Sequence, residues 1–215
     1  FATSQGNVRR NSLMDFVNVQ SNGKIAMKLD EGDKLINVRI CHEDNDIMLA
    51  ARSGKCIRFP VTDVRVFVGR NSTGVRGIKL AEGDEVISMS ILLHSDATSE
   101  ERDEYARIAS AIKRISAERG DDSCVSPEDT GLLNVLTTEK YKEMAEREQF
   151  ILSVTSTGYG KRTSSYEYRV TGRGGQGIAN MEMSARNKEI VSSFPIEDDN
   201  QIMMVTDGGK LIRMP

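Results

Sequence analysis

The chain has 215 residues, of which 38% are hydrophobic and 28% are charged, so it can form one or two domains with an apolar core. Its formal net charge of −3 disfavours, by itself, a nucleic-acid partner. No apolar run approaches the roughly 18 residues of a membrane helix, and no signal peptide is recognised, so we expect a cytoplasmic protein with no membrane partner.

Cysteine and histidine are sparse. Cys41, Cys56 and Cys124 lie far apart and outside any C-x-x-C motif, and the histidines are His42 and His94. This spacing fits neither a zinc site nor a disulfide scaffold, so the sequence predicts no metal and no cofactor in this chain. Reduced cysteines are typical of a cytosolic protein. We interpret the adjacent Cys41 and His42 as a buried thiol beside a surface histidine rather than as a catalytic pair.

The first 93 residues contain two similar units of short strands. Glycine turns in "FATSQGNVRR" at 1–10 and in "IMLAARSGKCIRF" at 47–59 each lead into a strand that ends near a basic residue. Further on, "GKIAMKL" matches "GVRGIKL", and "DEGDKLINV" matches "AEGDEVISM". Runs such as "DIMLAA", "KCIRF", "GIKLA" and "EVISMSILL" predict strands bounded by Gly, Asn and Asp turns. The spacing indicates a repeat of about 50 residues.

Residues 94–149 interrupt the repeat with a predicted helical insertion. Thr98 and Glu101 form a capping box at the start of its first helix, and Gly120 suits the end. Apolar residues at helical spacing predict a face that packs on the core of the parent domain; they are Tyr105, Ile108, Ile112 and Ile115. A second start signal, Ser-Pro at 126–127, precedes a second helical segment at 137–150.

The charge of the chain is divided unevenly between this insertion and the rest. The insertion holds 14 acidic and 8 basic residues, a net −6, whereas the remainder is +3. We interpret the acidic surplus as a solvated face. The alternative is that it repels DNA from one side or masks the basic remainder.

The repeated unit returns after the insertion. "ILSVTSTGYGKRT" at 151–163 repeats the earlier strand and turn, and "QIMMVTDGGKLIRMP" at 201–215 begins another copy. We expect positive φ at the four turn glycines, which are Gly6, Gly54, Gly158 and Gly209. Because the chain starts without Met and stops within a strand, we expect a piece of a longer polypeptide.

A glycine-rich loop with an arginine occurs in two of the units. "GRNSTG" at 69–74 and "GRGGQG" at 172–177 place Arg70 and Arg173 at the same position. The second loop also has the G-x-G-x-x-G spacing of dinucleotide-binding loops, but it neither follows a buried strand nor opens a clear helix. Because the loop recurs, we interpret its glycines as turn residues. Units of roughly 40–50 residues with several short strands predict an all-β fold with radial repetition, as in a propeller.

Four long runs in the β units are similar to one known family. They are "VGRNSTGVRGIKLAEGDEVISM", "STGYGKRTSSYEY", "SNGKIAMKLDEGDKLI" and "QIMMVTDGGKLIRMP". These runs resemble the C-terminal domain of the DNA gyrase A subunit, over residues 1–93 and 150–215. The related topoisomerase IV subunit has similar blades and is the alternative, although "GRNSTGVRGIKL" favours gyrase. The insertion at 94–149 is not part of the general family pattern.

The resemblance implies a six-bladed β-pinwheel, of which about four blade units are present here, the first and last incomplete. It implies sequence-nonspecific binding, bending and wrapping of duplex DNA, in support of ATP-dependent negative supercoiling by a type II topoisomerase. The implied partners are the B subunit of gyrase together with the breakage-reunion part of its A subunit, in an A2B2 tetramer that binds ATP and Mg²⁺ elsewhere. The family's catalytic tyrosine lies in that breakage-reunion part, so the resemblance implies no catalytic residue in this chain.

The resemblance also points to a basic glycine-rich box, close to Q-R-R-G-G-K-G, at the position of Thr171–Gly177. The loop here reads T-G-R-G-G-Q-G, so it keeps Arg173 and three glycines but lacks the leading Gln, one Arg and the Lys. In the family the full box belongs to the first blade. We therefore interpret this loop as a degenerate copy in a later blade.

Basic residues repeated around the rim of such a disc are candidates for DNA contact, because Lys and Arg pair with phosphates and set the path of the duplex rather than read its sequence. Few aromatic residues (5%) and no Trp disfavour binding of single strands by base stacking. For each residue the alternative is a solubilising surface charge. The predicted DNA-binding residues are Arg10, Lys24, Lys28, Arg58, Arg70, Arg76, Lys79, Lys161, Arg162, Arg173, Lys210 and Arg213.

Two other classes of function stay open at this point. A protein-binding propeller without a nucleic-acid role would expose aromatic or Met anchors. The methionines of the strand segments are interpreted as core residues instead; they are Met27, Met48, Met181, Met203 and Met204. An enzyme with a site on the propeller axis would need a cluster of His, Asp, Glu or Cys residues, which the sequence does not offer.

Overall fold

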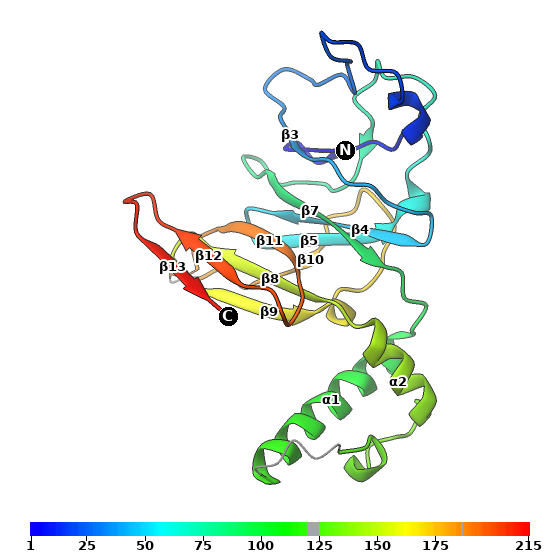
Figure 1. The fold of residues 1–215 in the computed structure, drawn as a ribbon, viewed down its shortest axis with the longest axis vertical. Coiled ribbons are helices and arrows are strands. Elements are labelled where there is room, and N and C mark those ends of the chain that lie inside the picture. The colour runs from blue at the N-terminus through cyan, green and yellow to red at the C-terminus, as the bar shows by residue number, and fades with distance from the viewer. Residues whose placement is uncertain (120–124, 186) are drawn as a thin grey trace.

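The computed structural model describes residues 1–119, 125–185 and 187–215, and its β units form four antiparallel sheets in succession (Figure 1). Two α-helices project from one end of this row of sheets. The predicted class, a repeated all-β fold with a helical insertion, is confirmed. In the part of the chain that the structure describes, no helix is long and apolar enough to cross a membrane.

The first two sheets share one four-stranded plan. Their strand orders are β3-β1-β2-β6 and β10-β5-β4-β7. One edge strand of each sheet, β6 in the first and β10 in the second, belongs to the next repeat, so backbone hydrogen bonds join neighbouring units. The bounds are β1 Ala2–Thr3, β2 Asn7–Val8, β3 Leu35–Asn37, β4 Asn45–Ala51, β5 Lys55–Pro60, β6 Val75–Arg76, β7 Val86–Leu93 and β10 Ile178–Ala179.

The third and fourth sheets have fewer strands. The third has the order β11-β8-β9 and the fourth pairs β12 with β13. Because two strands alone leave a face uncovered, Met203 is 61% exposed, and its predicted place in the core is wrong. The bounds are β8 Phe150–Thr155, β9 Gly160–Ser164, β11 Ile190–Ile196, β12 Ile202–Val205 and β13 Leu211–Met214.

The turns between paired strands follow the sequence prediction. The four turn glycines all have positive φ, between 75° and 88°. The predicted strand at 77–81 is wrong, however, because only Val75–Arg76 is paired there. The N–H groups of Gly77 and Ile78 both donate to the Gly6 carbonyl, at 2.7 and 3.3 Å, so this segment binds a turn of the previous unit instead of a strand.

The core lies between successive sheets, and the central strand β4 is buried on both faces. Ile47 and Leu49 pack in a cluster with the first sheet, whereas Met48 and Ala50 pack in a second cluster that reaches the third sheet. This division follows from the alternation of side chains along a strand. It explains why the segment reads as a continuous apolar run. Burial in the second cluster raises the pKa of the Cys56 thiol to about 12.

The insertion forms two helices, α1 at Ser99–Arg119 and α2 at Thr138–Arg147. The predicted capping box is confirmed: the Thr98 N–H donates to Glu101 Oε2 at 2.7 Å and the Glu101 N–H donates to Thr98 Oγ1 at 3.2 Å. The predicted stop at Gly120 and the third cysteine, Cys124, lie outside the described residues. Short 3-10 turns occupy η1 Leu13–Phe16, η2 Val61–Asp63, η3 Glu128–Thr130 and η4 Ser165–Glu167.

The helices have a small core of their own. Tyr105 and Ile108 of α1 pack with Tyr141 and Met144 of α2, and Tyr166 of η4 joins them from the β part. The Tyr105 ring lies 4.9 Å from the Tyr141 ring and 5.1 Å from the Tyr166 ring. The apolar stripe was predicted to face the core of the parent domain. It packs mainly within the insertion instead, against α2 and against Leu136 of the segment that precedes α2.

Candidate nucleic-acid interface

The two glycine-arginine loops have the same geometry against the preceding unit. Gly74 and Gly177 have φ of +96° and +74°. A Cβ at these positions would lie 2.3 Å from the Val8 carbonyl oxygen and 2.2 Å from the Cys56 carbonyl oxygen, respectively. Only glycine allows this approach and this φ together. Since the loop leads into the two-residue strand β10 rather than a helix, its glycines serve the packing of one unit on another.

The arginines of these loops bind backbone carbonyls and stay partly exposed. Arg70 Nη1 donates to the Ile25 carbonyl at 3.0 Å. Arg173 Nε donates to the Asp63 carbonyl at 3.2 Å, and its Nη1 donates to the Arg76 carbonyl. Both side chains are therefore held by neighbouring loops through part of the guanidinium group. Both residues are half-buried, so part of each side chain is accessible to a phosphate.

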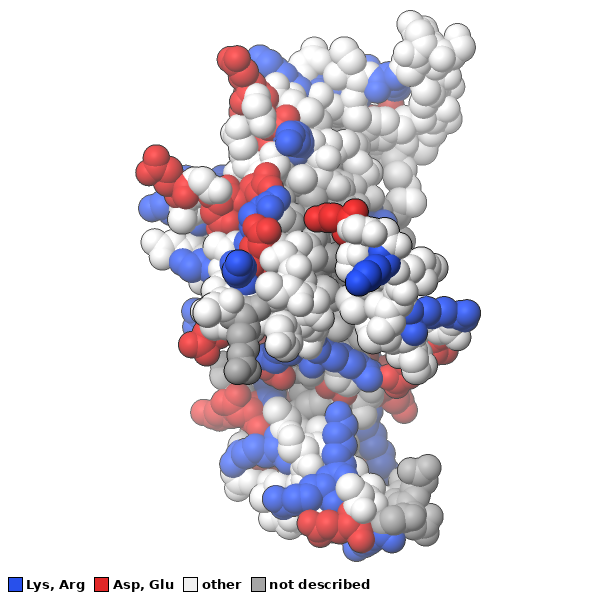
Figure 2. Space-filling view, turned by 90° about the vertical axis from the view of Figure 1, so that its left-hand side faces the viewer, with Lys and Arg blue, Asp and Glu red and all other residues white. Residues whose placement is uncertain are grey.

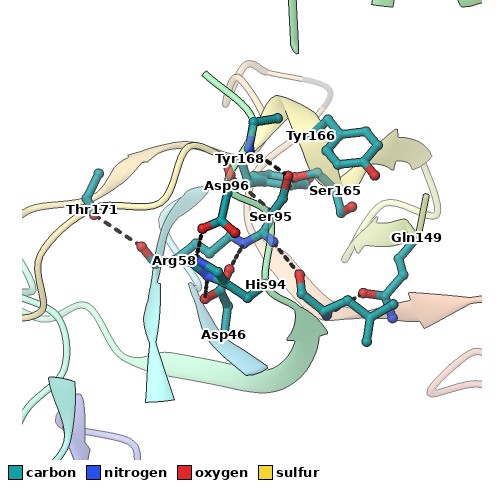
Figure 3. A network of polar contacts seen from close by, with 12 residues as sticks. Asp46, Arg58, His94, Ser95, Asp96, Gln149, Ser165, Tyr166, Tyr168 and Thr171 are labelled. Carbon is teal, nitrogen blue, oxygen red and sulfur yellow. Dashed lines mark hydrogen bonds and ion pairs between the residues drawn. The ribbon is translucent and has the colours of Figure 1, made fainter. Parts of the chain in front are cut away.

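Arg58 does not lie on the surface, and its predicted contact with DNA is wrong. The residue is 2% exposed, and its Nε lies 2.8 Å from Asp46 Oδ2 (Figure 3). Its Nη1 and Nη2 donate to the carbonyls of Ser165 and Leu93, both at 2.7 Å. Burial lowers the pKa of Arg58, against the opposing effect of Asp46. The guanidinium is enclosed because the third unit and the start of the insertion cover the end of β5.

The network around Arg58 continues to the first residues of the insertion. His94 Nδ1 lies 2.7 Å from Asp46 Oδ1, and its Nε2 lies 3.0 Å from Asp96 Oδ1 (Figure 3). The hydrogen bond with Asp46 raises the pKa of His94; burial opposes this, and Asp96 adds to it. Since Asp46 is fully buried and lies on β4, this network ties the insertion to the second sheet.

The other arginines at the same place in the repeat occupy different environments. Arg10 forms a backbone β-bridge with Val66, and Arg58 forms the equivalent β-bridge with Val170. The only ion pair of Arg10 in the described structure, however, is with the exposed Glu43, at 3.4 Å. Arg162 is exposed, 2.5 Å from Asp198 and 3.9 Å above the Phe150 ring. Arg213 donates to the Gln201 side chain. A repeated position in the sequence thus does not give these arginines a repeated contact surface.

Three of the predicted residues lie around one junction between units. The Arg173 loop contacts the segment that carries Arg76 and Lys79: the Gly174 N–H donates to the Gly77 carbonyl at 2.7 Å, and the Lys79 N–H donates to the Gly175 carbonyl at 2.8 Å. The side chains of Arg76 and Lys79 are exposed. Among the residues that the structure describes, neither has a carboxylate oxygen within 4.0 Å. We name Arg76, Lys79 and Arg173 the junction cluster.

The remaining predicted residues are dispersed. Lys28 and Lys210 are exposed, and Lys161 lies 3.9 Å from Glu167. Lys24 donates to the carbonyls of Asp15 and Asn18, which leaves it half-buried.

A second pair of repeated basic residues was not among the predicted DNA-binding residues. Arg65 and Arg169 precede the bridge residues Val66 and Val170, so they occupy equivalent positions in the two units. Both are exposed, and Arg65 lies 4.4 Å above the Phe67 ring. The signal was present, because Arg-Val recurs shortly before each glycine-arginine loop.

Comparison with known proteins agrees with this repeated geometry. The family model described as "DNA gyrase C-terminal domain, beta-propeller" matches residues 1–42, 45–92, 149–196 and 200–215. The chain belongs to this family. Most of the insertion, within residues 93–148, lies outside the match, and the DNA gyrase C-terminal domain family therefore accounts for the β units alone.

Curated relatives, each named as the A subunit of DNA gyrase, resemble the whole chain. The protein of Granulibacter bethesdensis is 52% identical over 228 residues, which cover 100% of this chain and 24% of the relative. That of Rickettsia bellii is 50% identical, covering 99% and 23%, and that of Escherichia coli K12 is 32% identical, covering 99% and 18%. The chain thus spans about a quarter or less of these relatives.

Solved structures of the family share the fold. The C-terminal domain of DNA topoisomerase IV superposes with a TM-score of 0.69 at 17% identity, over 100% of this chain and 50% of that one. A DNA gyrase A C-terminal domain gives 0.64 at 20% identity, over 99% and 53%. The expected β-pinwheel is thereby confirmed.

Proposed function

We propose that this chain binds, bends and wraps duplex DNA without sequence specificity, as the C-terminal domain of a DNA gyrase A subunit. The observation that carries the proposal is the junction cluster in a chain of this family. There, two exposed cations without a carboxylate partner among the described residues adjoin the partly free guanidinium of Arg173. Cations of this kind pair with phosphates and release counterions.

The energetics favour a curved path along the edges of the sheets. Bending 20–30 base pairs by 40–90° costs on the order of 1–6 kcal/mol. Contacts with phosphates from successive units can offset that cost. We therefore assign the path to the junction cluster together with two exposed cations that precede the glycine-arginine loops in the sequence, Arg65 and Arg169. Arg58 is excluded from it by burial.

The parent activity follows from the relatives. Those named above are gyrase A subunits, which favours gyrase over topoisomerase IV. We infer that the full enzyme is an ATP-dependent type II topoisomerase that introduces negative supercoils. Its partners are then the gyrase B subunit together with the breakage-reunion part of the A subunit, in an A2B2 assembly in the cytoplasm. Residues 1–93 and 150–215 form the wrapping part of this chain, and 94–149 form the insertion.

A salt titration of DNA binding tests the proposal. In the variant Arg76→Gln with Lys79→Gln, affinity for a duplex should fall, and the slope of log affinity against log salt should fall by about 0.9 for each lost phosphate contact. The control variant, Lys34→Gln with Lys188→Gln, removes the same charge from exposed positions outside the junction cluster. Fluorescence anisotropy from 50 to 200 mM salt, a range over which about 6–10 contacts change affinity by roughly 10³–10⁵, gives the slopes.

Identical slopes for both variants and the unaltered chain would refute the assignment of the junction cluster. Wrapping itself is measured separately, by closing relaxed circular DNA in the presence of the chain. A shift in linking number that grows with protein concentration is expected, and no shift at saturating binding would show that the chain binds DNA without wrapping it.

A further inference from the structure

The helical insertion is joined to the β units at two places. Its entry segment, residues 94–98, follows β7, and its exit segment, residues 148–149, precedes β8. On the exit side, the Tyr166 hydroxyl of η4 donates to the Met144 carbonyl of α2 at 2.8 Å. Figure 2 shows Lys and Arg side chains beside Asp and Glu over the lower, helical part of the molecule, so charges of both signs are mixed there. The attachment of the insertion therefore depends on individual contacts rather than on a field of one sign.

The entry segment is held by an imidazole ring that lies between two carboxylates (Figure 3). His94 Nδ1 lies 2.7 Å from Asp46 Oδ1 of β4, and His94 Nε2 lies 3.0 Å from Asp96 Oδ1 of the entry segment. An ionised carboxylate only accepts hydrogen bonds, so both contacts require a proton on each ring nitrogen. A neutral imidazole has a single N–H. The complete bridge from Asp46 to Asp96 therefore exists only while His94 is protonated.

Burial decides which of the two hydrogen bonds is lost when the ring becomes neutral. The Asp46 side chain is 0% exposed, whereas the Asp96 side chain is 95% exposed. A buried carboxylate that loses a donor cannot be hydrated, but water replaces the donor of an exposed one. A neutral His94 therefore keeps its N–H toward Asp46. Its Nε2 lone pair then faces an oxygen of Asp96, and because two acceptors repel, Asp96 turns into solvent.

The other charges around His94 keep their state over the same pH range. Arg147 Nη2 donates to the His94 carbonyl at 3.1 Å, so it holds the backbone and not the ring. Glu143 of α2 pairs with Lys140 at 3.1 Å and with Arg147 at 3.8 Å. Among these residue types only histidine has an ordinary pKa between 5 and 8. The charged residues that surround His94 in the described structure are Asp46, Arg58, Asp96, Lys140, Glu143 and Arg147.

From this geometry we propose that Asp46, His94 and Asp96 form a proton-operated latch on the helical insertion. The protonated ring fixes residues 95–98 to the second sheet, so the insertion is held at its entry and at its exit. When the ring loses its proton, Asp96 is released and the exit side alone holds the insertion. His94 and Asp96 lie outside the match to the family model, whereas Asp46 lies within it. The latch thus joins the inserted segment to the family fold, and it operates whether or not the chain binds DNA.

The direction of the pH dependence follows from the two carboxylates. The hydrogen bond with Asp46 raises the pKa of His94 most, burial opposes this, and Asp96 adds to the rise. The latch is therefore closed below the ordinary histidine pKa of about 6.5 and opens as pH rises through the folded-state pKa.

Nuclear magnetic resonance of the ¹⁵N-labelled full chain from pH 5.5 to 8.5 tests the proposal. The ring nitrogen resonances of His94 show which nitrogen loses its proton, and we expect it to be Nε2. Backbone order parameters of residues 95–98 should fall from about 0.85 toward about 0.6 over the same titration, while those of α2 stay high. Loss of the proton from Nδ1, or order parameters that stay constant while the ring titrates, would overturn the proposal.

Three variants separate the latch from a purely structural role, and circular dichroism confirms that each is folded. Asp96→Ala removes only the exposed acceptor, so residues 95–98 should have low order parameters already at pH 5.5, with no further change on titration. Asp103→Ala removes the same charge from an exposed position of α1, and His42→Gln removes the other, exposed histidine of the chain. Both controls should titrate like the unaltered chain. If Asp96→Ala also does so, the latch is wrong.

Discussion

The buried ion pair of Arg58 and Asp46 leads to a quantitative prediction about the free energy of unfolding. The substitution Arg58→Met keeps much of the volume of the side chain but removes the charge and every N–H donor. Asp46, which is 0% exposed, then loses its partner at 2.8 Å. The carbonyls of Ser165 and Leu93 lose donors at 2.7 Å as well.

The expected loss is large because one partner of a buried ion pair is removed. Such changes cost about 3–5 kcal/mol in free energy of unfolding, since they leave a buried charge without compensation. His94 still lies 2.7 Å from Asp46 and compensates the carboxylate when it is protonated. The loss should therefore lie at the lower end of this range at pH 5.5 and at the upper end at pH 8.5.

Urea unfolding followed by circular dichroism measures this difference. The matched control is Arg162→Met, at the same place in the next repeat, where both partners of the pair with Asp198 are exposed. An exposed pair contributes about 0–1 kcal/mol. In a chain of this size each 1 kcal/mol shifts Tm by about 2–4 °C, so thermal melting should distinguish the variants. Equal losses for the two variants would refute the argument that burial, rather than position in the repeat, decides the role of these arginines.

Three further predictions concern other elements. The folded-state pKa of His94 is raised above 6.5, so the stability that its protonation contributes is complete below about pH 6.5 and is lost as pH rises through the folded pKa. The free energy of unfolding, measured from pH 5.5 to 8.5, should show this decline, and His94→Gln should flatten it. Gly177→Ala should cost roughly 1–3 kcal/mol, measured by urea unfolding, because its Cβ would meet the backbone at positive φ, whereas Gly172→Ala has open space and should cost less than about 0.5 kcal/mol. Burial opposes ionisation of Glu104, but the hydrogen bonds from the N–H groups of residues 134–136 outweigh it and lower the pKa of Glu104. Glu104→Gln should therefore speed amide hydrogen exchange at residues 134–136, and an unchanged exchange pattern would contradict this.

The repeats could be predicted because they depend on local rules. A turn with positive φ requires glycine, and a short strand requires alternating or continuous apolar residues, so each unit leaves the same pattern in the sequence. The capping box of α1 was equally visible, since its two hydrogen bonds join residues three apart. The structure confirms the turn glycines and the capping box.

The environment of the repeated arginines could not be predicted from the same pattern. Arg58 and Arg162 end equivalent strands, but the segment from Ser165 to Thr171 covers only the first of them. Whether a strand end is covered depends on which units flank it. That information lies more than 100 residues away in the chain.

The sequence by itself determined that this chain is a row of β units with a helical insertion, because turns, strands and caps are encoded within a few residues of one another. Tertiary structure alone decided which charges face solvent. It buried Arg58 against Asp46, gathered the junction cluster from two units, and buried Glu104 of the insertion while it left most other carboxylates of that segment exposed. Coulomb interactions depend on distance and burial, and a sum of charges along the sequence contains neither.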